Sequence, residues 1–197
     1  MKILYISCHS ILEYDELRIL HDLGHNVFSI GAYITPKTPH VNIRPPLNYD
    51  VDSQLIENYN KNGLSKEFFD QFDCVIVMHL LSFIEKHWEI LKHKITILRT
   101  IGQNIDPNEL ELQKYVKEGL KILRYSPKER EIKNYAGENH LVRFLKYKSD
   151  FKERINSKKS VISFGQSVKQ RNAHCGACHI EELATKVPFK LFGPNND

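Results

Sequence analysis

Two histidines stand directly after apolar stretches that have the length of buried strands. His9 follows residues 2–8, and His79 follows residues 74–78. An imidazole changes its charge near neutral pH, so either ring could accept the proton of a hydroxyl group in a transfer reaction. The plainer interpretation of each residue is a loop histidine or a helix cap. The pattern makes His9 and His79 candidate catalytic residues.

Polar residues also follow two other apolar stretches, which end at Arg99 and Arg124. Two arginines at strand ends could hold a phosphate or an acidic sugar through paired N–H donors. Alternatively, both could be structural arginines that donate to loop carbonyls. Gly102 would let the backbone approach a ligand, or it could simply make a turn. The candidate substrate-binding residues are Ser10, Arg99, Thr100, Gly102, Gln103, Arg124 and Ser126.

A third set of polar residues lies near the carboxyl end of the sequence. Lys169 and Arg171 stand just before a predicted helix, and together with its N-terminus they could bind a nucleotide diphosphate. The alternative is a solvated basic turn. The candidate residues of this group are Gly165, Gln166, Ser167, Lys169 and Arg171.

Residues 175–179 have the form Cys-x-x-Cys-His of a c-type haem attachment site. That chemistry requires export, and the amino-terminal residues do not form a signal peptide. With His174 the segment could bind zinc, but adjacent residues of a helix point ~100° apart, so four ligands from one helix would be strained. We favour small buried thiols that pack a helix onto its sheet, and we predict no metal site.

Short apolar stretches alternate with amphipathic ones along most of the chain. This alternation predicts an α/β fold built on a Rossmann-like parallel sheet of about six strands, with helices on both faces. Ligands of such sheets bind outside the carboxyl ends of the strands, so the candidate residues at those ends should line one cleft. Predicted strands cover residues 2–8, 26–30, 74–78, 95–98, 120–124 and 141–145. Predicted helices cover residues 14–23, 51–60, 65–71, 81–91, 107–117 and 128–135.

The composition indicates a soluble globular protein, with 41% hydrophobic residues, 26% charged residues and a net charge of +4. The mild positive surplus suits a small anionic ligand, and the lack of a dense Lys/Arg block argues against a nucleic-acid partner. No apolar run approaches the ~18 residues of a transmembrane segment. Cysteines without a secretory signal indicate a reducing compartment, so we expect a cytoplasmic protein.

The pattern changes after residue 145, where a charged stretch precedes a strand-helix-strand pattern at residues 161–192. We place a domain boundary near Asn156, which gives a Rossmann-like domain at 1–156 and a single β-α-β unit at 157–197. One such unit cannot bury its own apolar faces. We therefore expect residues 157–197 to dock, and we favour pairing between two copies of the chain in a homo-oligomer.

Two α/β units joined by a charged linker resemble a GT-B glycosyltransferase. The start Met1-Lys2-Ile3-Leu4-Tyr5-Ile6, together with Gly24-His25-Asn26-Val27, resembles the first β-α-β unit of the acceptor-side domain. Residues 99–103 and 119–129 are similar to bacterial and phage glycosyltransferase-like sequences. Residues 163–167, Arg171 and residues 191–195 resemble the start of the donor-side domain.

The resemblance implies transfer of a sugar from a nucleotide-sugar donor to a glycan or other hydroxyl acceptor, with no cofactor and no obligate bound metal. It implies that His9 or His79 acts as a base, as in inverting members, and that residues 165–171 bind the donor. An acidic donor-binding motif of retaining members would lie beyond Asp197, so the resemblance implies an incomplete donor-side domain. The alternatives are a non-catalytic α/β binding or assembly domain and a Cys/His metal-binding protein.

Overall fold

The computed structural model describes residues 1–31, 52–101, 109–143, 161–164, 182, 185–186 and 189–192. The chain forms two compact units, Met1–Lys148 and Ser149–Asp197. The boundary expected from the sequence, near Asn156, falls shortly after this division.

The described part of the first unit alternates strands with helices. In chain order its elements are β1 (Lys2–Ile6), α1 (Ser10–Asp22), β2 (Asn26–Ile30), α2 (Ser53–Asn62), α3 (Lys66–Phe69), β3 (Cys74–Met78), α4 (Leu81–Leu91), β4 (Ile95–Arg99), α5 (Glu109–Lys117), β5 (Lys121–Arg124), the 3₁₀ helix η1 (Pro127–Glu131) and β6 (His140–Leu141).

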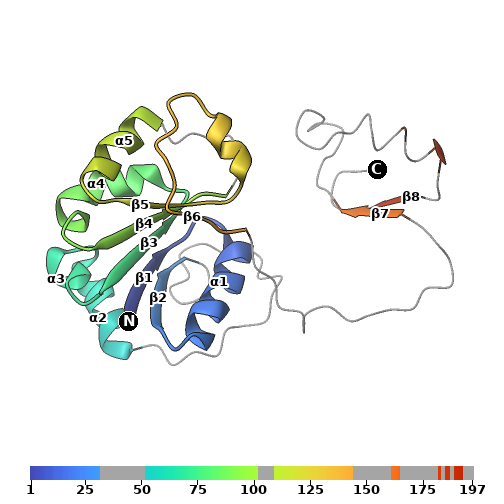
Figure 1. The fold of residues 1–197 in the computed structure, drawn as a ribbon. Coiled ribbons are helices and arrows are strands. Elements are labelled where there is room, and N and C mark those ends of the chain that lie inside the picture. The colour runs from blue at the N-terminus through green and yellow to red at the C-terminus, as the bar shows by residue number, and fades with distance from the viewer. Residues whose placement is uncertain are drawn as a thin grey trace. The chain divides into compact units, whose positions relative to one another are not determined.

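These strands form one six-stranded sheet in the order β2-β1-β3-β4-β5-β6 (Figure 1). Every neighbouring pair is parallel, with β1 bonded to β2 on one side and to β3 on the other. The chain runs outward from β1 to β2, returns across β1 to β3, and then continues in one direction to β6. The predicted α/β fold with a parallel sheet is therefore confirmed.

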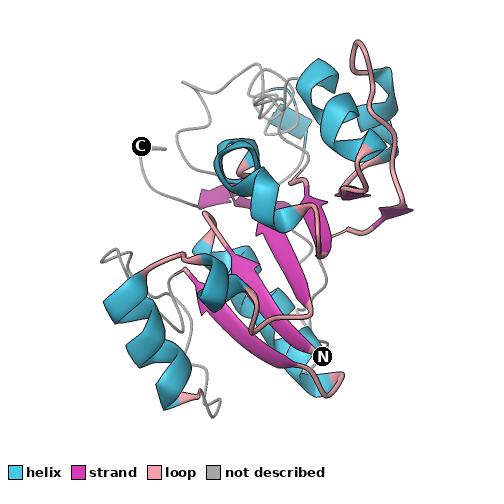
Figure 2. Cartoon of the chain, turned by 90° about the vertical axis from the view of Figure 1, so that its left-hand side faces the viewer, coloured by secondary structure: helices cyan, strands magenta, loops and turns pink. Residues whose placement is uncertain are grey.

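Helices cover both faces of the sheet (Figure 2). One core lies between the sheet and helices α2 to α5, and its buried members include Leu55, Phe68 and Trp88. The other core lies between the sheet and α1, where Leu12 and Leu17 pack against the strands. The reversal of direction at β1 explains this division, because right-handed crossovers that run in opposite directions place their helices on opposite faces.

Local sequence signals explain where the helices start. The His9 imidazole caps α1, since its Nδ1 accepts the Leu12 N–H at 3.4 Å. Asp52 caps α2 and Ser65 caps α3 through side-chain oxygens, as these residue types commonly do. Because His9 caps its first turn, α1 begins at Ser10, four residues before the start of the helix predicted at 14–23.

The region after β5 differs most from the prediction. A helix was expected over residues 128–135, but η1 ends at Glu131 and Asn134 adopts a left-handed backbone with φ of 60°. The last strand was expected at 141–145, and the structure has β6 at His140–Leu141, with residues 144–145 outside the described ranges. The early end of η1 leaves room for the turn that returns the chain to the sheet beside β5.

The described part of the second unit contains two strands, β7 (Val161–Phe164) and β8 (Phe189–Phe192). They pair in parallel, with Val161 opposite Phe189 and Phe164 opposite Phe192. Both strands lie where the sequence pattern placed them.

We expect Phe68→Ala to lower the free energy of unfolding of the first unit by about 3–5 kcal/mol. Phe68 is fully buried, and its ring contacts those of Phe28, Tyr59 and Phe72, so truncation would leave a cavity in the larger core. Urea denaturation followed by the fluorescence of Trp88, the sole tryptophan, measures this unit because Trp88 belongs to the same core.

Leu23→Ala is the matched control for that substitution. Leu23 is 67% exposed, and its truncation should change the stability by less than about 0.5 kcal/mol. Equal losses for the two variants would contradict the assignment of the core.

Candidate functional site

The order of the strands creates a switch point between β1 and β3, where the two neighbouring strands continue into connections that run in opposite directions. Doubly wound sheets bind their ligands in the crevice outside the carboxyl ends of such strands. In this chain Ser7, Cys8 and His9 follow β1, and His79 follows β3. The two predicted catalytic histidines thus lie on the two loops that flank the switch point.

Hydrogen bonds join these loops to the neighbouring strands. The Ser7 N–H donates to the Ile30 carbonyl at 3.2 Å, which fastens the loop after β1 to the end of β2. On the other side, the Cys8 thiol donates to the Met78 carbonyl at 3.5 Å. Burial raises the pKa of the Cys8 thiol, so the group remains protonated at neutral pH and can serve as this donor.

His9 has a structural role in this arrangement. Its Nδ1 accepts the Leu12 N–H, so a neutral ring carries its proton on Nε2. Its backbone N–H donates to Ser7 Oγ at 3.1 Å, which closes a tight turn before α1. Protonation of Nδ1 would remove the cap. The helix-cap interpretation of His9 therefore agrees with its contacts.

His79 lies in an unusual backbone conformation. Its φ is 58°, in the left-handed region that non-glycine residues rarely occupy. The His79 N–H donates to the Arg99 carbonyl at 2.9 Å, which holds the residue beside the end of β4. Burial lowers the pKa of His79 from its usual value, against a smaller opposing effect of the Glu129 carboxylate. The imidazole is thus neutral at pH 7 and able to accept a proton.

The two predicted binding arginines point to opposite faces of the sheet. Arg99 lies on the α1 face, where its Nε donates to Glu16 Oε1 at 3.1 Å. The other Glu16 oxygen accepts the Tyr5 hydroxyl at 2.7 Å. Arg124 lies on the α5 face, where it binds Glu109. Although β4 and β5 are neighbours, the structure does not bring the two guanidinium groups together.

The strand register explains this separation. Met78 pairs with Arg99, and Arg99 pairs with Leu123. Paired residues of parallel strands share a face, and the next residue of each strand lies on the opposite face. Thr100 and Arg124, each one residue beyond the pair of Arg99 with Leu123, therefore lie on the α5 face, where both bind the Glu129 carboxylate.

Arg124 is the more completely bonded of these two residues. Its Nη1 and Nη2 donate to the two Glu109 oxygens, each at 2.8 Å, and its Nε donates to the Gly137 carbonyl at 3.1 Å. The guanidinium also stacks on Tyr135, with 4.7 Å to the ring centroid. The side chain is fully buried. These contacts agree with the alternative of a structural arginine that donates to a loop carbonyl. The structure adds carboxylates to its partners.

Hydrogen bonds to Glu129 connect the loop after β5 with the end of β4. Its Oε1 accepts the Thr100 hydroxyl at 2.9 Å and the N–H groups of Tyr125 and Ser126 at 2.9 and 3.0 Å. Ser126 Oγ in turn accepts the Lys128 N–H, so Ser126 and Glu129 form a capping box at the start of η1. Thr100 and Ser126, which were predicted to bind substrate, are both used in this network.

The remaining predicted residues divide into two groups. Ser10 is the first residue of α1, at the switch point, but its side chain is not described. The other candidates lie outside the described residues, so their predictions stay predictions. These are Gly102, Gln103, Gly165, Gln166, Ser167, Lys169 and Arg171, along with the Cys/His segment at 174–179.

Sequence reasoning missed the acidic partners that neutralise the arginines. Glu16, Glu109 and Glu129 occur in stretches of mixed polarity that predict a solvated surface. One signal was present, because Ser126-Pro127-Lys128-Glu129 has the form of a capping box. No comparable local pattern marks Glu16 or Glu109, whose partners are 83 and 15 residues away.

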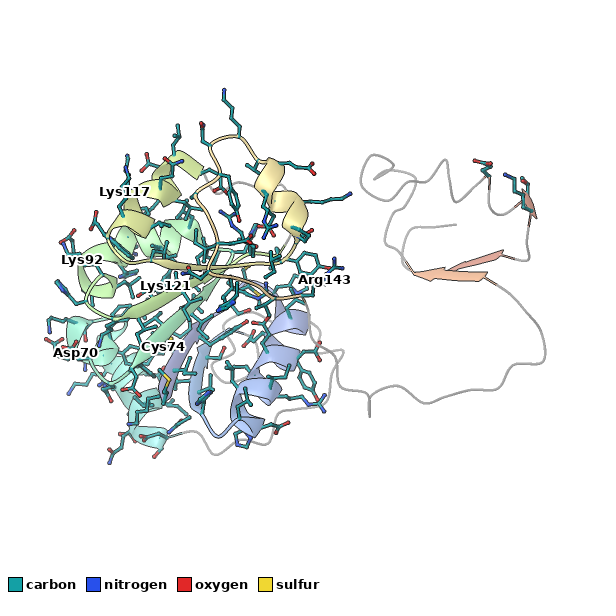
Figure 3. The ribbon with its side chains drawn as sticks, in the orientation of Figure 1. Asp70, Cys74, Lys92, Lys117, Lys121 and Arg143 are labelled. Carbon is teal, nitrogen blue, oxygen red and sulfur yellow. The ribbon has the colours of Figure 1, made fainter. Side chains whose placement is uncertain are left out.

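The opposite end of the sheet, where the strands begin, carries exposed charged residues. Asp70, Lys92 and Lys117 project outward there, away from Arg143 beyond the end of β6 (Figure 3). The charges at this edge form exposed pairs such as Lys66 with Asp70 at 2.5 Å. Such pairs contribute little to stability and indicate a solvated edge, which leaves the carboxyl ends as the candidate site.

Within the described ranges, no helix is long and apolar enough to cross a membrane. The same residues contain no group of three or more His, Cys, Asp or Glu side chains that could hold a metal ion.

The fold and the switch point define the class of the first unit, a doubly wound α/β protein with a Rossmann-like sheet. No protein-family model, curated protein or solved structure matches the chain. The residues at the carboxyl ends of the strands are therefore the basis for a proposed function.

We expect Glu109→Ala to lower the free energy of unfolding by about 3–5 kcal/mol, because it removes the bidentate partner of a buried guanidinium. Glu111→Ala on the same helix breaks a surface pair with Lys114 and should cost about 0–1 kcal/mol. Urea denaturation followed by Trp88 fluorescence measures both. A loss below 1 kcal/mol for Glu109→Ala would contradict the importance of the pair.

Proposed function

We propose that the chain is a glycosyltransferase of the GT-B type, which transfers a sugar from a nucleotide-sugar donor to a hydroxyl acceptor, with His79 as the base. The observation that carries this proposal is the placement of His79. It follows β3 at the switch point, partly exposed and neutral, in a left-handed conformation held by the Arg99 carbonyl. Backbone conformations of this kind are concentrated at functional sites.

Two features of the architecture support the reaction class. The first unit has the doubly wound sheet expected of an acceptor-side domain, and the second unit contains a parallel strand pair of the kind expected at the start of a donor-side domain. Residues 165–171, which follow β7, remain the proposed donor-binding segment. The reaction needs neither a cofactor nor a bound metal, since a nucleoside diphosphate is already a good leaving group.

The chemistry assigned to His79 is general-base catalysis. The imidazole takes the proton of the acceptor hydroxyl while the acceptor oxygen forms a bond to the anomeric carbon of the sugar. The bond between that carbon and the diphosphate oxygen breaks, and the nucleoside diphosphate leaves with the electron pair. His9 is the weaker candidate for this role, because its Nδ1 already caps α1.

The first test is donor binding and turnover by the full chain. We expect one of UDP-, GDP- or dTDP-hexose to raise the melting temperature and to release a nucleoside diphosphate when a sugar or glycan acceptor is added. His79→Asn should reduce turnover by about 10²–10⁴-fold while donor binding persists, since the base is lost. Asn is the suitable replacement because it tolerates a positive φ.

His93→Asn serves as the matched control, because His93 is an exposed histidine after α4, at the opposite edge of the sheet. Its turnover should equal that of the wild type. Loss of turnover in His9→Asn with full activity in His79→Asn would transfer the role of base to His9. The absence of both donor binding and turnover would overturn the proposal and favour a non-catalytic binding or assembly domain.

The pH dependence of turnover is a separate prediction. The base must be neutral, so turnover should rise as the pH rises through the pKa of His79 and then remain level. Because burial lowers this pKa from 6.5, the midpoint of the rise should lie below pH 6.5. Measurement of kcat/KM from pH 4.5 to 8.5 tests this, and a midpoint above 6.5 would contradict the assignment of His79.

A further inference from the structure

Glu16 of α1 joins two strands that are not neighbours in the sheet. Its Oε2 accepts the hydroxyl of Tyr5 on β1 at 2.7 Å, and its Oε1 accepts the Nε–H of Arg99 on β4 at 3.1 Å. Between these two strands lies β3, which ends at Met78 and leads directly to His79. We call the contacts of Tyr5, Glu16 and Arg99 the Glu16 clamp.

The strand register places both donors of the Glu16 clamp on the α1 face. Tyr5 pairs with Ile76, and Arg99 pairs with Met78. Paired residues share a face of the sheet, and so do residues two apart on one strand. Ile76 and Met78 therefore lie on this face between the two donors, and the Tyr5 hydroxyl is 4.0 Å from Met78 Sδ. The clamp thus spans the end of β3.

The Glu16 clamp is largely shielded from water. Tyr5 and Arg99 are fully buried, and the side chain of Glu16 is 17% exposed. Glu16 follows Leu12 by one helical turn, so its carboxylate lies on the face of α1 that packs against the sheet. Burial, and next the Glu16 carboxylate, raise the pKa of Tyr5, so the phenol keeps its proton and remains a donor. Loss of the carboxylate would break the ion pair of a buried guanidinium.

Arg99 connects the Glu16 clamp to the backbone of His79. The peptide group between Arg99 and Thr100 is held from two sides. Its carbonyl accepts the His79 N–H at 2.9 Å, and its N–H donates to the Leu123 carbonyl at 3.0 Å. The Arg99 Nη1 also donates to the Thr100 carbonyl at 2.9 Å. A fixed guanidinium therefore restrains the segment that carries the acceptor of the His79 N–H.

We propose that Glu16 is a positioning residue, which holds His79 in its left-handed backbone conformation through Arg99. The inference rests on the proposed function in giving His79 the role of base. Glu16 does not need to touch the acceptor or the donor. A φ of 58° is strained for a histidine, so this conformation persists only while neighbouring contacts restrain it.

The test is an NMR measurement on the full chain without any ligand. At a positive φ the amide and α hydrogens of one residue lie close together, so the NOE between them is strong. Asn134, with φ of 60°, provides an internal reference far from the Glu16 clamp in the sequence. In Glu16→Ala we expect the NOE of His79 to lose most of its intensity relative to that of Asn134.

Glu13→Ala is the matched control. Glu13 is also a buried carboxylate of α1, but it accepts the hydroxyl of Ser29 on β2, an edge strand that does not contact β3. Its removal should leave the NOE of His79 unchanged. An equal loss of the signal in Glu13→Ala would show that any damage to the packing of α1 releases His79, and would overturn the specific role of Glu16.

An unchanged NOE of His79 in folded Glu16→Ala would likewise overturn the inference. If that variant does not fold, Tyr5→Phe decides the matter, because it keeps the ring and removes only the bond between β1 and Glu16. The NOE of His79 should then weaken, and full intensity in Tyr5→Phe would contradict the inference.

The NOE requires neither donor nor turnover, so this inference and the proposed function can fail separately. A weakened NOE in Glu16→Ala of a chain without glycosyl transfer would uphold the Glu16 clamp and reject the glycosyltransferase. If turnover is found, Glu16→Ala should lower kcat with little change in the KM for the donor. Added to His79→Asn, it should cause no further loss, because Glu16 acts through His79. A further loss equal to that in the wild type would overturn the inference.

Discussion

The buried charge of Arg124 is the constraint on which the carboxyl edge of the sheet depends. A guanidinium without water must be neutralised and given acceptors, and here Glu109 supplies both oxygens of a bidentate pair while Glu129 adds a third. These contacts join the start of α5, the end of β5 and η1. Thr100 extends the same network to β4. The geometry around the candidate site is therefore determined by charge compensation as well as by apolar packing.

The reversal of the chain at β1 determines which residues can act together. It creates the switch point, and it places α1 on one face and the later helices on the other. Arg99 and Arg124 end neighbouring strands, but the sheet separates them because Arg99 pairs with Leu123, the residue before Arg124. Each is bound to carboxylates on its own face, so neither is placed as part of a pair for a phosphate. His79 differs, because it lies at the switch point and keeps a partly exposed side chain.

His79 combines a strained backbone with rigid surroundings. The left-handed backbone of His79 costs about 1–3 kcal/mol, and it persists only because its neighbours hold it. The Arg99 carbonyl supplies one restraint, and the packed ends of β3 and β4 supply the rest. In the proposed reaction, an imidazole held in this way would lose little freedom when an acceptor hydroxyl approaches.

The sequence by itself determined most of the secondary structure before residue 127, the parallel sheet and the end of the sheet at which polar residues gather, because hydrophobic periodicity and capping act over a few residues. It also placed His9 and His79 after the correct strands. Only the tertiary structure decided which face each strand-end side chain occupies, since a shift of one residue in register reverses that choice. It likewise decided that Glu16 and Glu109 neutralise Arg99 and Arg124, because those partners come from distant parts of the chain and leave no periodic signal. Local patterns therefore predicted the elements, while the long-range pairing of buried charges determined the structural partners of the two arginines.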